Sequence, residues 1–234
     1  MSEKTRLMVA LDVPELTDAL NLVDQLGDQV EWYKVGKQLF THFGPVVLKE
    51  LKGRGRKVFL DMKFHDIPNT VSQAIRSAAL IGADIINVHA LGGPAMLAAA
   101  AAAGKETGKT VIAVTVLTSM DAEQLNAIGV QASPAEQVLR LARLTKEAGL
   151  PGVVCSALEL PMLRREFGTE FLTLVPGIRP AGASAGDQKR IMTPAQAADA
   201  GASYIIVGRP IVAAPEPAAA ARAVLEELAN VAGN

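Results

Sequence analysis

Short apolar runs rich in β-branched residues recur along the chain and alternate with longer segments in which apolar residues follow a helical period. Continuous apolarity over about five to seven residues indicates strands that are buried on both faces, as in a parallel sheet. Eight such strands are predicted, at residues 7–13, 32–36, 57–63, 85–90, 110–117, 152–157, 171–177 and 204–210.

The segments between these runs carry the signals of helices. Several begin with a proline in the first turn and end at a glycine, which is the usual asymmetry of helix termini. An order of strand and helix that repeats eight times predicts an α/β fold, a (β/α)8 TIM barrel in which residues 1–234 form a single domain. The alternative is an open doubly wound sheet, but this sequence has no G-x-G-x-x-G turn after the first strand to support it. The predicted helices are 14–27, 70–83, 93–104, 133–149 and 215–233.

Composition narrows the classes of partner. The chain is 50% hydrophobic and 20% charged, and its formal net charge at pH 7 is -1, so no overall basic excess attracts nucleic acid or an anionic membrane. No segment approaches the length of apolar sequence that a membrane-spanning helix needs, and the first residues do not resemble a signal peptide. We therefore expect a cytoplasmic protein that binds neither nucleic acid nor membrane.

Cysteine and histidine give no sign of a metal or redox site. The single cysteine, Cys155, lies in the apolar run GVVCSA and is interpreted as a small buried hydrophobe. The three histidines, His42, His65 and His89, are too far apart in sequence to form a recognisable metal motif. The sequence thus predicts neither a metal ion nor a cofactor.

Polar and charged residues stand where the predicted strands end. In a barrel of this type the active site lies at the carboxyl-terminal ends of the strands, where the loops that follow them meet. A structural interpretation stays open for individual residues: Asp12 could cap the next helix, Lys34 could lie on the rim, and His89 could be a core histidine. The strand-end residues are Asp12, Lys34, Asp61, Lys63, His89, Thr118, Pro176, Gly208 and Arg209.

The segment FLDMKFHDIPNT concentrates charge directly after a buried run. Residues two apart in a strand face the same side, so Asp61 and Lys63 are predicted to point into the barrel mouth while Met62 packs outward. Carboxylates of Asp61 and Asp66 on either side of the lysine favour its charged form. A charged ammonium suits a proton donor that also stabilises a developing carbanion, whereas a Schiff-base lysine must be neutral. An ion-pair network that only closes the barrel top is the remaining alternative.

The last two strand ends suggest that the substrate carries a phosphate. Barrel enzymes commonly hold phosphate in the loops after strands seven and eight, with backbone N–H groups and planar cations as donors. Gly177 and Gly208 would let the backbone approach an anion, and Arg179, Gln188 and Arg209 would donate to it. The long loop at about 177–193 is predicted to be a phosphate-binding lid.

Several motifs together resemble bacterial orotidine 5′-monophosphate decarboxylases. The most specific is DMKFHDIPNT, which contains the string D-x-K-x-x-D-I-P-N-T. The resemblance extends over the whole chain, from the first predicted strand to the last helix. The supporting motifs are ALDV, YKVG, VTVLTSM, PGIRP, GDQKRIMTP and VGRP.

This resemblance implies decarboxylation of orotidine 5′-monophosphate to uridine 5′-monophosphate (UMP) and CO₂, the last step of UMP synthesis, without a metal or organic cofactor. It implies that Lys63 stabilises and protonates a carbanion at C6 of the pyrimidine, and that Asp61 lies against the leaving carboxylate. Asp66 completes the catalytic set. The residues implied to bind substrate are Asp12, Lys34, Ile67, Thr70, Thr118, Pro176, Arg179, Gln188, Gly208 and Arg209.

The resemblance also implies a homodimer in which Asp66, Ile67 and Thr70 enter the active site of the neighbouring subunit. Two alternatives stay open at this point. One is a Mg²⁺-dependent sugar-phosphate decarboxylase or aldolase of the same barrel superfamily, although such enzymes lack the IPNT continuation. The other is a catalytically silent barrel that only binds a nucleotide.

Overall fold

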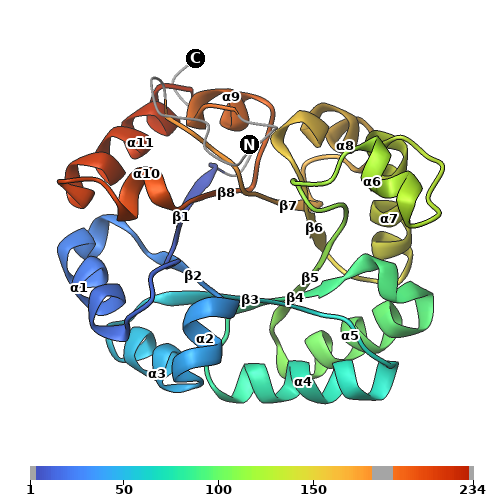
Figure 1. Cartoon of the computed structure of the whole chain (residues 1–234), viewed down its shortest axis with the longest axis horizontal. Helices are drawn as coiled ribbons and strands as arrows, with labels where there is room; N and C mark the ends of the chain where they lie inside the picture. Colours follow the sequence, from blue (N-terminus) through green and yellow to red (C-terminus); the bar gives the residue numbers. More distant parts are fainter. Residues whose placement is uncertain (1–3, 181–191, 232–234) are drawn as a thin grey trace.

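The structure, a computed structural model, describes residues 4–180 and 192–231. Within these residues eight parallel strands close into a barrel, and the helices surround the ring of strands (Figure 1). Each strand pairs with the next one in the chain and β8 pairs with β1, which confirms the predicted (β/α)8 barrel and excludes the open sheet. The strands are β1 (Arg6–Ala10), β2 (Trp32–Gly36), β3 (Lys57–Phe64), β4 (Ile85–His89), β5 (Thr110–Val114), β6 (Gly152–Val154), β7 (Leu172–Val175) and β8 (Tyr204–Val207).

The five predicted helices are present, with ends that differ by a few residues, and shorter helices complete the ring. The shorter ones escaped the sequence pattern because fewer than three turns show little periodicity. The α-helices are α1 (Leu16–Leu26), α2 (Lys37–Phe43), α3 (Val46–Gly53), α4 (Pro68–Leu80), α5 (Gly93–Thr107), α6 (Ala122–Ala127), α7 (Pro134–Glu147), α8 (Leu160–Phe167), α9 (Pro194–Asp199), α10 (Arg209–Val212) and α11 (Pro217–Val231). Short 3₁₀ helices are η1 (Gly27–Gln29), η2 (Ala90–Gly92) and η3 (Ala157–Glu159).

Most of the observed strands are shorter than predicted, and their polar ends lie in the loops that follow. The predicted strand 110–117 ends at Val114, and β6 contains only Gly152–Val154. The long connection after β5 holds α6, whose first turn is closed by a capping box between Asp121 and Gln124. The apolar runs thus continue past the strands, because loop residues at the barrel mouth are also buried.

Two hydrophobic cores lie on the two sides of the sheet. Successive side chains of a strand point to opposite faces, so the inner and outer residues alternate. The outer core fills the space between the sheet and the helices, and Met62 packs against it as predicted. The inner core fills the barrel and consists of Met8, Ala10, Trp32, Phe59, Ile85, Ile112, Leu174, Tyr204 and Ile206.

Polar side chains replace this inner core toward the carboxyl ends of the strands. Lys34, Asp61 and Asn87 each follow an inner-core residue of the same strand by two positions and therefore face the barrel interior. Lys34 is 9% exposed and Asn87 is 0% exposed. The strand period thus places a polar layer directly above the apolar filling, at the end of the barrel where active sites are found.

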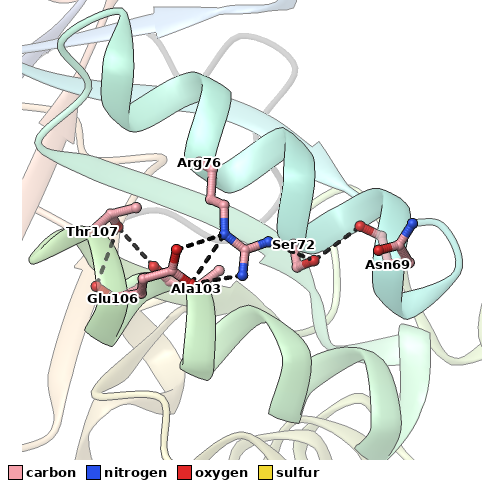
Figure 2. A network of polar contacts seen from close by, with 7 residues as sticks. Asn69, Ser72, Arg76, Ala103, Glu106 and Thr107 are labelled. Atoms are coloured by element: carbon pink, nitrogen blue, oxygen red, sulfur yellow. Dashed lines mark hydrogen bonds and ion pairs between the residues drawn. The ribbon is translucent and has the colours of Figure 1, made fainter.

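The helices α4 and α5 lie side by side on the outside of the barrel and are joined by a polar network (Figure 2). Arg76 of α4 donates to both carboxylate oxygens of Glu106 of α5, with N–O distances of 2.7 to 3.1 Å. Its remaining terminal nitrogen donates to Ser72 Oγ, which in turn donates to the carbonyl of Asn69. The first turn of α4, which follows the charged segment of β3, is thus tied to α5.

No helix in the described ranges 4–180 and 192–231 is both long and apolar enough to span a lipid bilayer.

Candidate active site

The predicted charges at the ends of β1, β2 and β3 meet in one array. Asp61 Oδ1 accepts a hydrogen bond from Lys63 Nζ at 2.5 Å, and Asp61 Oδ2 lies 3.7 Å from Lys34 Nζ. Lys34 Nζ also donates to Asp12 Oδ1 at 2.8 Å. The array therefore alternates in sign along the order Asp12, Lys34, Asp61, Lys63. Each lysine of the array thus lies beside at least one carboxylate.

A glycine makes room for the first pair of this array. Gly36 ends β2, and a Cβ added there would lie 3.0 Å from Lys34 Nζ and 3.2 Å from Asp12 Oδ1. Its φ of -95° is accessible to any residue, so the requirement is for space rather than for backbone freedom. A side chain at this position would be tighter than ordinary contact, and the two ends of the ion pair would have to shift by a few tenths of an ångström.

Lys63 reaches Asp61 by a backbone geometry that simple alternation does not predict. The pairing of β3 with β4 shifts between Leu60 and Phe64, so that β3 carries extra residues opposite Ile86 and Val88. Within this shift Lys63 has a φ of 53°, and among the described residues it is the one residue other than glycine with a positive φ. Such conformations are uncommon for side chains with a Cβ and often mark functional sites. The pairing of Asp61 with Lys63 was predicted correctly, but the strand is bulged at that point.

The protonation of Asp61 reflects two opposing effects. Burial, the larger single effect, raises the pKa of this carboxyl group, whose side chain is 14% exposed. The charges of Lys63 and Lys34 and hydrogen bonds from Lys63 and Asn87 act the other way and bring the pKa of Asp61 below its usual value. Asp61 is therefore a carboxylate at neutral pH, and it is fixed between two cations.

Asp66, Ile67 and Thr70 lie beyond this array. All three are exposed, and Asp66 Oδ1 accepts a hydrogen bond from the N–H of Ile67 at 2.6 Å. In the described part of the chain the carboxylate that contacts Lys63 is Asp61. Asp66 therefore does not flank Lys63 of its own subunit, and the implied contact of Asp66 with the neighbouring subunit's site stays a prediction.

The ends of β7 and β8 place two arginines near each other. Arg179 is 8% exposed, and burial and the charge of Arg209 both lower its pKa. Gly177 has a φ of 79°, which favours glycine, and Gly208 precedes Arg209 at the start of α10. Two neighbouring guanidinium groups with glycines beside them are a suitable site for a phosphate. Gln188 and the part of the predicted lid at 181–191 lie outside the described residues.

The phosphate side and the ionic array are neighbours around the barrel. A Cβ added to Gly208 would lie 3.8 Å from Asp12 Oδ2, because β8 pairs with β1. Pro176 follows β7 directly, and Thr118 lies four residues beyond the end of β5. The ends of the predicted lid are also close together, since the N–H of Arg179 donates to the carbonyl of Met192 at 3.0 Å.

His89 ends β4 on the opposite part of the rim. Its ring stacks on that of His65, with centroids 5.5 Å apart, and its Nδ1 accepts a hydrogen bond from the N–H of Leu91. Burial lowers the pKa of His89 to about 4, and the positive charges of His65, Lys63 and Lys37 contribute in the same direction. His89 is therefore neutral at physiological pH.

Two residues of the site were missed from the sequence, namely Gly36 and Asn87. Asn87 Nδ2 donates to Asp61 Oδ1, and Asn87 Oδ1 accepts from the backbone N–H of Lys63, both at 2.7 Å. Its signal in the sequence is a polar residue inside the apolar run IINVH, two positions before His89. Gly36 carries no signal, because its role depends on a contact between β1 and β2.

The closed barrel and the ionic array at the carboxyl ends of its strands define the class of the protein: it is a (β/α)8-barrel enzyme. The sequence profile described as "Orotidine 5'-phosphate decarboxylase / HUMPS family" matches residues 5–224, and the chain belongs to this family.

Individual relatives agree with this assignment over nearly the full length. The chain is 51% identical to the orotidine 5′-phosphate decarboxylase of Nitrosococcus oceani, over 98% of this chain and 100% of that protein. It is 50% identical to the enzyme of the same name from Moorella thermoacetica, over 99% of this chain and 95% of that one. Among solved structures, the orotidine 5′-phosphate decarboxylase of Lactobacillus acidophilus superposes with a TM-score of 0.84 at 39% identity, covering 96% of this chain and 99% of that chain.

Proposed function

We propose that the mouth of this barrel decarboxylates orotidine 5′-monophosphate to UMP and CO₂, the last step of UMP biosynthesis. The named relatives, at about half identity over nearly the whole chain, support this substrate. The structural observation that carries the proposal is the ion pair of Lys63 with the buried Asp61 at the end of β3. The protein is accordingly a carboxy-lyase.

The chemical step breaks the bond between C6 of the pyrimidine and the carboxylate carbon. The bonding electrons stay on C6, where they lie in the ring plane and cannot spread into the π system. In our proposal the ammonium of Lys63 lies beside C6, stabilises this negative charge and then transfers a proton from Nζ to it. The products are CO₂, UMP and a neutral lysine that regains its proton from solvent.

Asp61 and Lys34 fix the geometry of this step. Asp61 accepts from Lys63 at 2.5 Å and lies 3.7 Å from Lys34, so the ammonium of Lys63 is oriented before substrate arrives. An array that is already ordered needs no reorganisation as charge develops on the substrate, and such electrostatic preorganisation is usually the largest contribution to catalysis. Asp61 would also lie against the substrate carboxylate that leaves.

The remaining mouth residues are proposed to bind the parts of the substrate that do not react. Asp12 and Lys34 would hold the ribose hydroxyls, and Thr118 and Pro176 would contact the pyrimidine. The phosphate would lie between Arg179 and Arg209, near Gly208, with Gln188 as a further donor. Binding of a remote phosphate can stabilise the transition state by holding the pyrimidine against Lys63.

The decisive experiment follows the ultraviolet absorbance of orotidine 5′-monophosphate with purified protein in the presence of EDTA. We expect rapid loss of the orotate band with the wild type and none with Lys63→Ala. A matched control is Lys57→Ala, which removes a lysine at the opposite end of the same strand, where Lys57 pairs with Glu31. It should retain full activity.

Other outcomes would contradict the proposal in distinct ways. Turnover by Lys63→Ala would show that this lysine is not needed for the reaction. Activity that EDTA abolishes and Mg²⁺ restores would favour a metal-dependent barrel enzyme. Binding of the nucleotide without turnover would favour a silent barrel.

We also propose that the functional unit is a homodimer in which Asp66, Ile67 and Thr70 contribute to the active site of the neighbouring subunit. Ile67 is 66% exposed although it is a large apolar residue, and it follows the ionic array directly. Association with a second copy of the chain would bury it. The network of Ser72, Arg76 and Glu106 holds the adjacent turn of α4 in place (Figure 2).

This proposal is tested by Ile67→Asp, with Leu80→Asp as the control. Both residues are exposed hydrophobics at opposite ends of α4, and Leu80 is 88% exposed. Analytical ultracentrifugation should show that Ile67→Asp favours monomers and that Leu80→Asp does not. The specific activity of Ile67→Asp should fall on dilution. A monomeric wild type with full activity would contradict the shared site.

A further inference from the structure

Asn87 is a polar side chain buried inside the barrel next to the proposed catalytic lysine. It lies in β4, where the inner-core residue Ile85 precedes it by two positions, and it is 0% exposed. Substrate in the mouth cannot reach it, because its surface is fully covered by protein. Its side chain instead reaches across to β3, where both of its polar atoms find partners.

The first partner is the backbone of Lys63. Asn87 Oδ1 accepts the N–H of Lys63 at 2.7 Å, at the point where the pairing of β3 with β4 shifts register. A bulged residue loses its regular partner in the strand ladder, and a buried N–H needs another. The carboxamide of Asn87 supplies it while Lys63 holds its φ of 53°. This side chain thus takes the place of a backbone carbonyl.

The second partner is the carboxylate of Asp61. Asn87 Nδ2 donates to Asp61 Oδ1 at 2.7 Å, and the same oxygen accepts from Lys63 Nζ. The orientation of the amide follows from chemistry: a backbone N–H can only donate and a carboxylate can only accept, so Oδ1 faces Lys63 and Nδ2 faces Asp61. The contacts form a closed ring through Asn87, the backbone and side chain of Lys63, and Asp61.

We propose that Asn87 is a positioning residue, which holds Lys63 in its left-handed backbone conformation and Asp61 in its orientation, so that the ammonium of Lys63 is aimed at the reacting carbon. The inference deepens the proposed decarboxylase function and rests on it for its kinetic part. Asn87 does not touch substrate. It hydrogen-bonds to Asp61 and to the backbone of Lys63 and so orients the groups that contact the substrate.

The role predicts a kinetic signature. Asn87→Ala removes both bonds, so kcat should fall by about 10- to 100-fold, as for other outer partners of active-site groups. The KM and the affinity for UMP should change little, because the binding residues are untouched. Asn87→Asp has nearly the same shape and keeps the acceptor for Lys63, but it places a second carboxylate beside Asp61. The kcat of Asn87→Asp should therefore also fall.

A pH profile separates positioning from a general packing role. Asp61 is faced by Lys34 from β2, by Lys63 from β3 and by Asn87 from β4. Loss of the donated hydrogen bond raises the pKa of Asp61, and a new carboxylate raises it further. The acidic limb of kcat/KM should therefore move to higher pH in Asn87→Ala and further in Asn87→Asp.

Thr173→Ala is the matched control. Thr173 is also 0% exposed and hydrogen-bonded, in β7, to Arg164 and to the N–H of Ser203, away from the ionic array. It should lower thermal stability without moving kcat or the pH profile. If folded Asn87 variants behave like Thr173→Ala, with lower stability but wild-type kcat and an unmoved acidic limb, the inference is overturned.

One measurement needs neither variants nor substrate. The amide hydrogen of Lys63 should exchange slowly with solvent in the wild-type protein, because Asn87 accepts it inside the barrel. Rapid exchange would overturn the inference even if no Asn87 variant folds. An inactive wild type with a protected Lys63 amide would instead contradict the proposed function, so the two failures are distinguishable.

Discussion

At the scale of single residues, the proposed site depends on Gly36 for space. Gly36→Ala would place a methyl group 3.0 Å from Lys34 Nζ and 3.2 Å from Asp12 Oδ1, so this ion pair must shift by a few tenths of an ångström and its hydrogen bond weakens. Full loss of a charged hydrogen bond costs about 1.5 to 3 kcal/mol, so kcat/KM for orotidine 5′-monophosphate should fall by up to roughly 100-fold. Steady-state kinetics on the purified variant measure this.

Gly53→Ala is the control for this prediction. Gly53 lies at the end of α3, and a Cβ there would meet no atom within 4 Å. It should leave activity unchanged and raise the free energy of unfolding by about 0.4 to 1 kcal/mol, since alanine restricts the unfolded chain. Equal kinetic effects of the two substitutions would contradict the steric account of Gly36.

His89 should make the stability of the protein depend on pH. Burial and nearby positive charges lower its pKa to about 4 in the folded state, while the unfolded value is 6.5. Below pH 6.5 the unfolded chain binds a proton that the folded chain does not. The contribution of neutral His89 to the free energy of unfolding is therefore fully present above pH 6.5 and is lost as pH falls through about 4. Because His89 is partly exposed, solvent screening limits the loss to the order of 1 kcal/mol.

Urea denaturation at neutral and at mildly acidic pH measures this contribution. His89→Gln should lose less stability on acidification than the wild type does. His42→Gln, which removes an exposed histidine on α2, should behave like the wild type. If His89→Gln and the wild type lose the same amount, His89 does not cause the pH dependence.

At the scale of elements, strand alternation predicted which side of β3 faces the mouth, and the structure agrees for Asp61 and Met62. Lys63 also meets Asp61, as predicted, but through a bulge rather than by alternation. The register shift between β3 and β4 could not be predicted, because it is a property of the pair of strands. Within one subunit Lys63 pairs with Asp61, as predicted, and the contact of Asp66 with the neighbouring subunit stays a prediction.

The packing of α5 on the sheet gives a prediction at this scale. The helix is rich in alanine, yet Gly104 occurs where it approaches β5. A Cβ there would lie 2.8 Å from Val111 Cγ2 and 3.2 Å from the carbonyl of Lys109. Gly104→Ala should therefore destabilise the protein by about 1 to 3 kcal/mol, although alanine is the better helix former.

Chemical denaturation compares this variant with Gly53→Ala, in which the added methyl group meets open space. The two substitutions are chemically identical and both lie in the last turn of a helix, so any gain in helix propensity has the same sign in both. They should change stability in opposite directions. A stabilised Gly104→Ala would show that the contact with Val111 relaxes without cost.

At the scale of the whole molecule, the proposed phosphate site and the reacting groups lie on different parts of the barrel rim. Arg209→Ala should lower kcat/KM for orotidine 5′-monophosphate and leave turnover of orotidine, which has no phosphate, nearly unchanged. Arg222→Ala, an exposed arginine of α11, is the control and should change neither. Equal losses on both substrates would show that Arg209 supports the fold rather than the phosphate.

The sequence by itself determined the barrel and much of its chemistry. Apolar runs of strand length alternating with helical periods predicted all eight strands, and charges at the ends of those runs predicted Asp12, Lys34, Asp61 and Lys63 as neighbours. These features are local, because a strand or helix period is set by residues close together in the chain. Helices of fewer than three turns, such as α2, α6 and α10, were missed because they are too short to show a helical period of apolar residues.

The tertiary structure alone decided how the charges are held. The roles of Asn87 and Gly36 depend on which residues of neighbouring strands stand opposite one another, and that register is set by closure of the whole barrel. The left-handed conformation of Lys63 follows from the same pairing. Such contacts join residues more than twenty positions apart, so no local pattern in the chain encodes them.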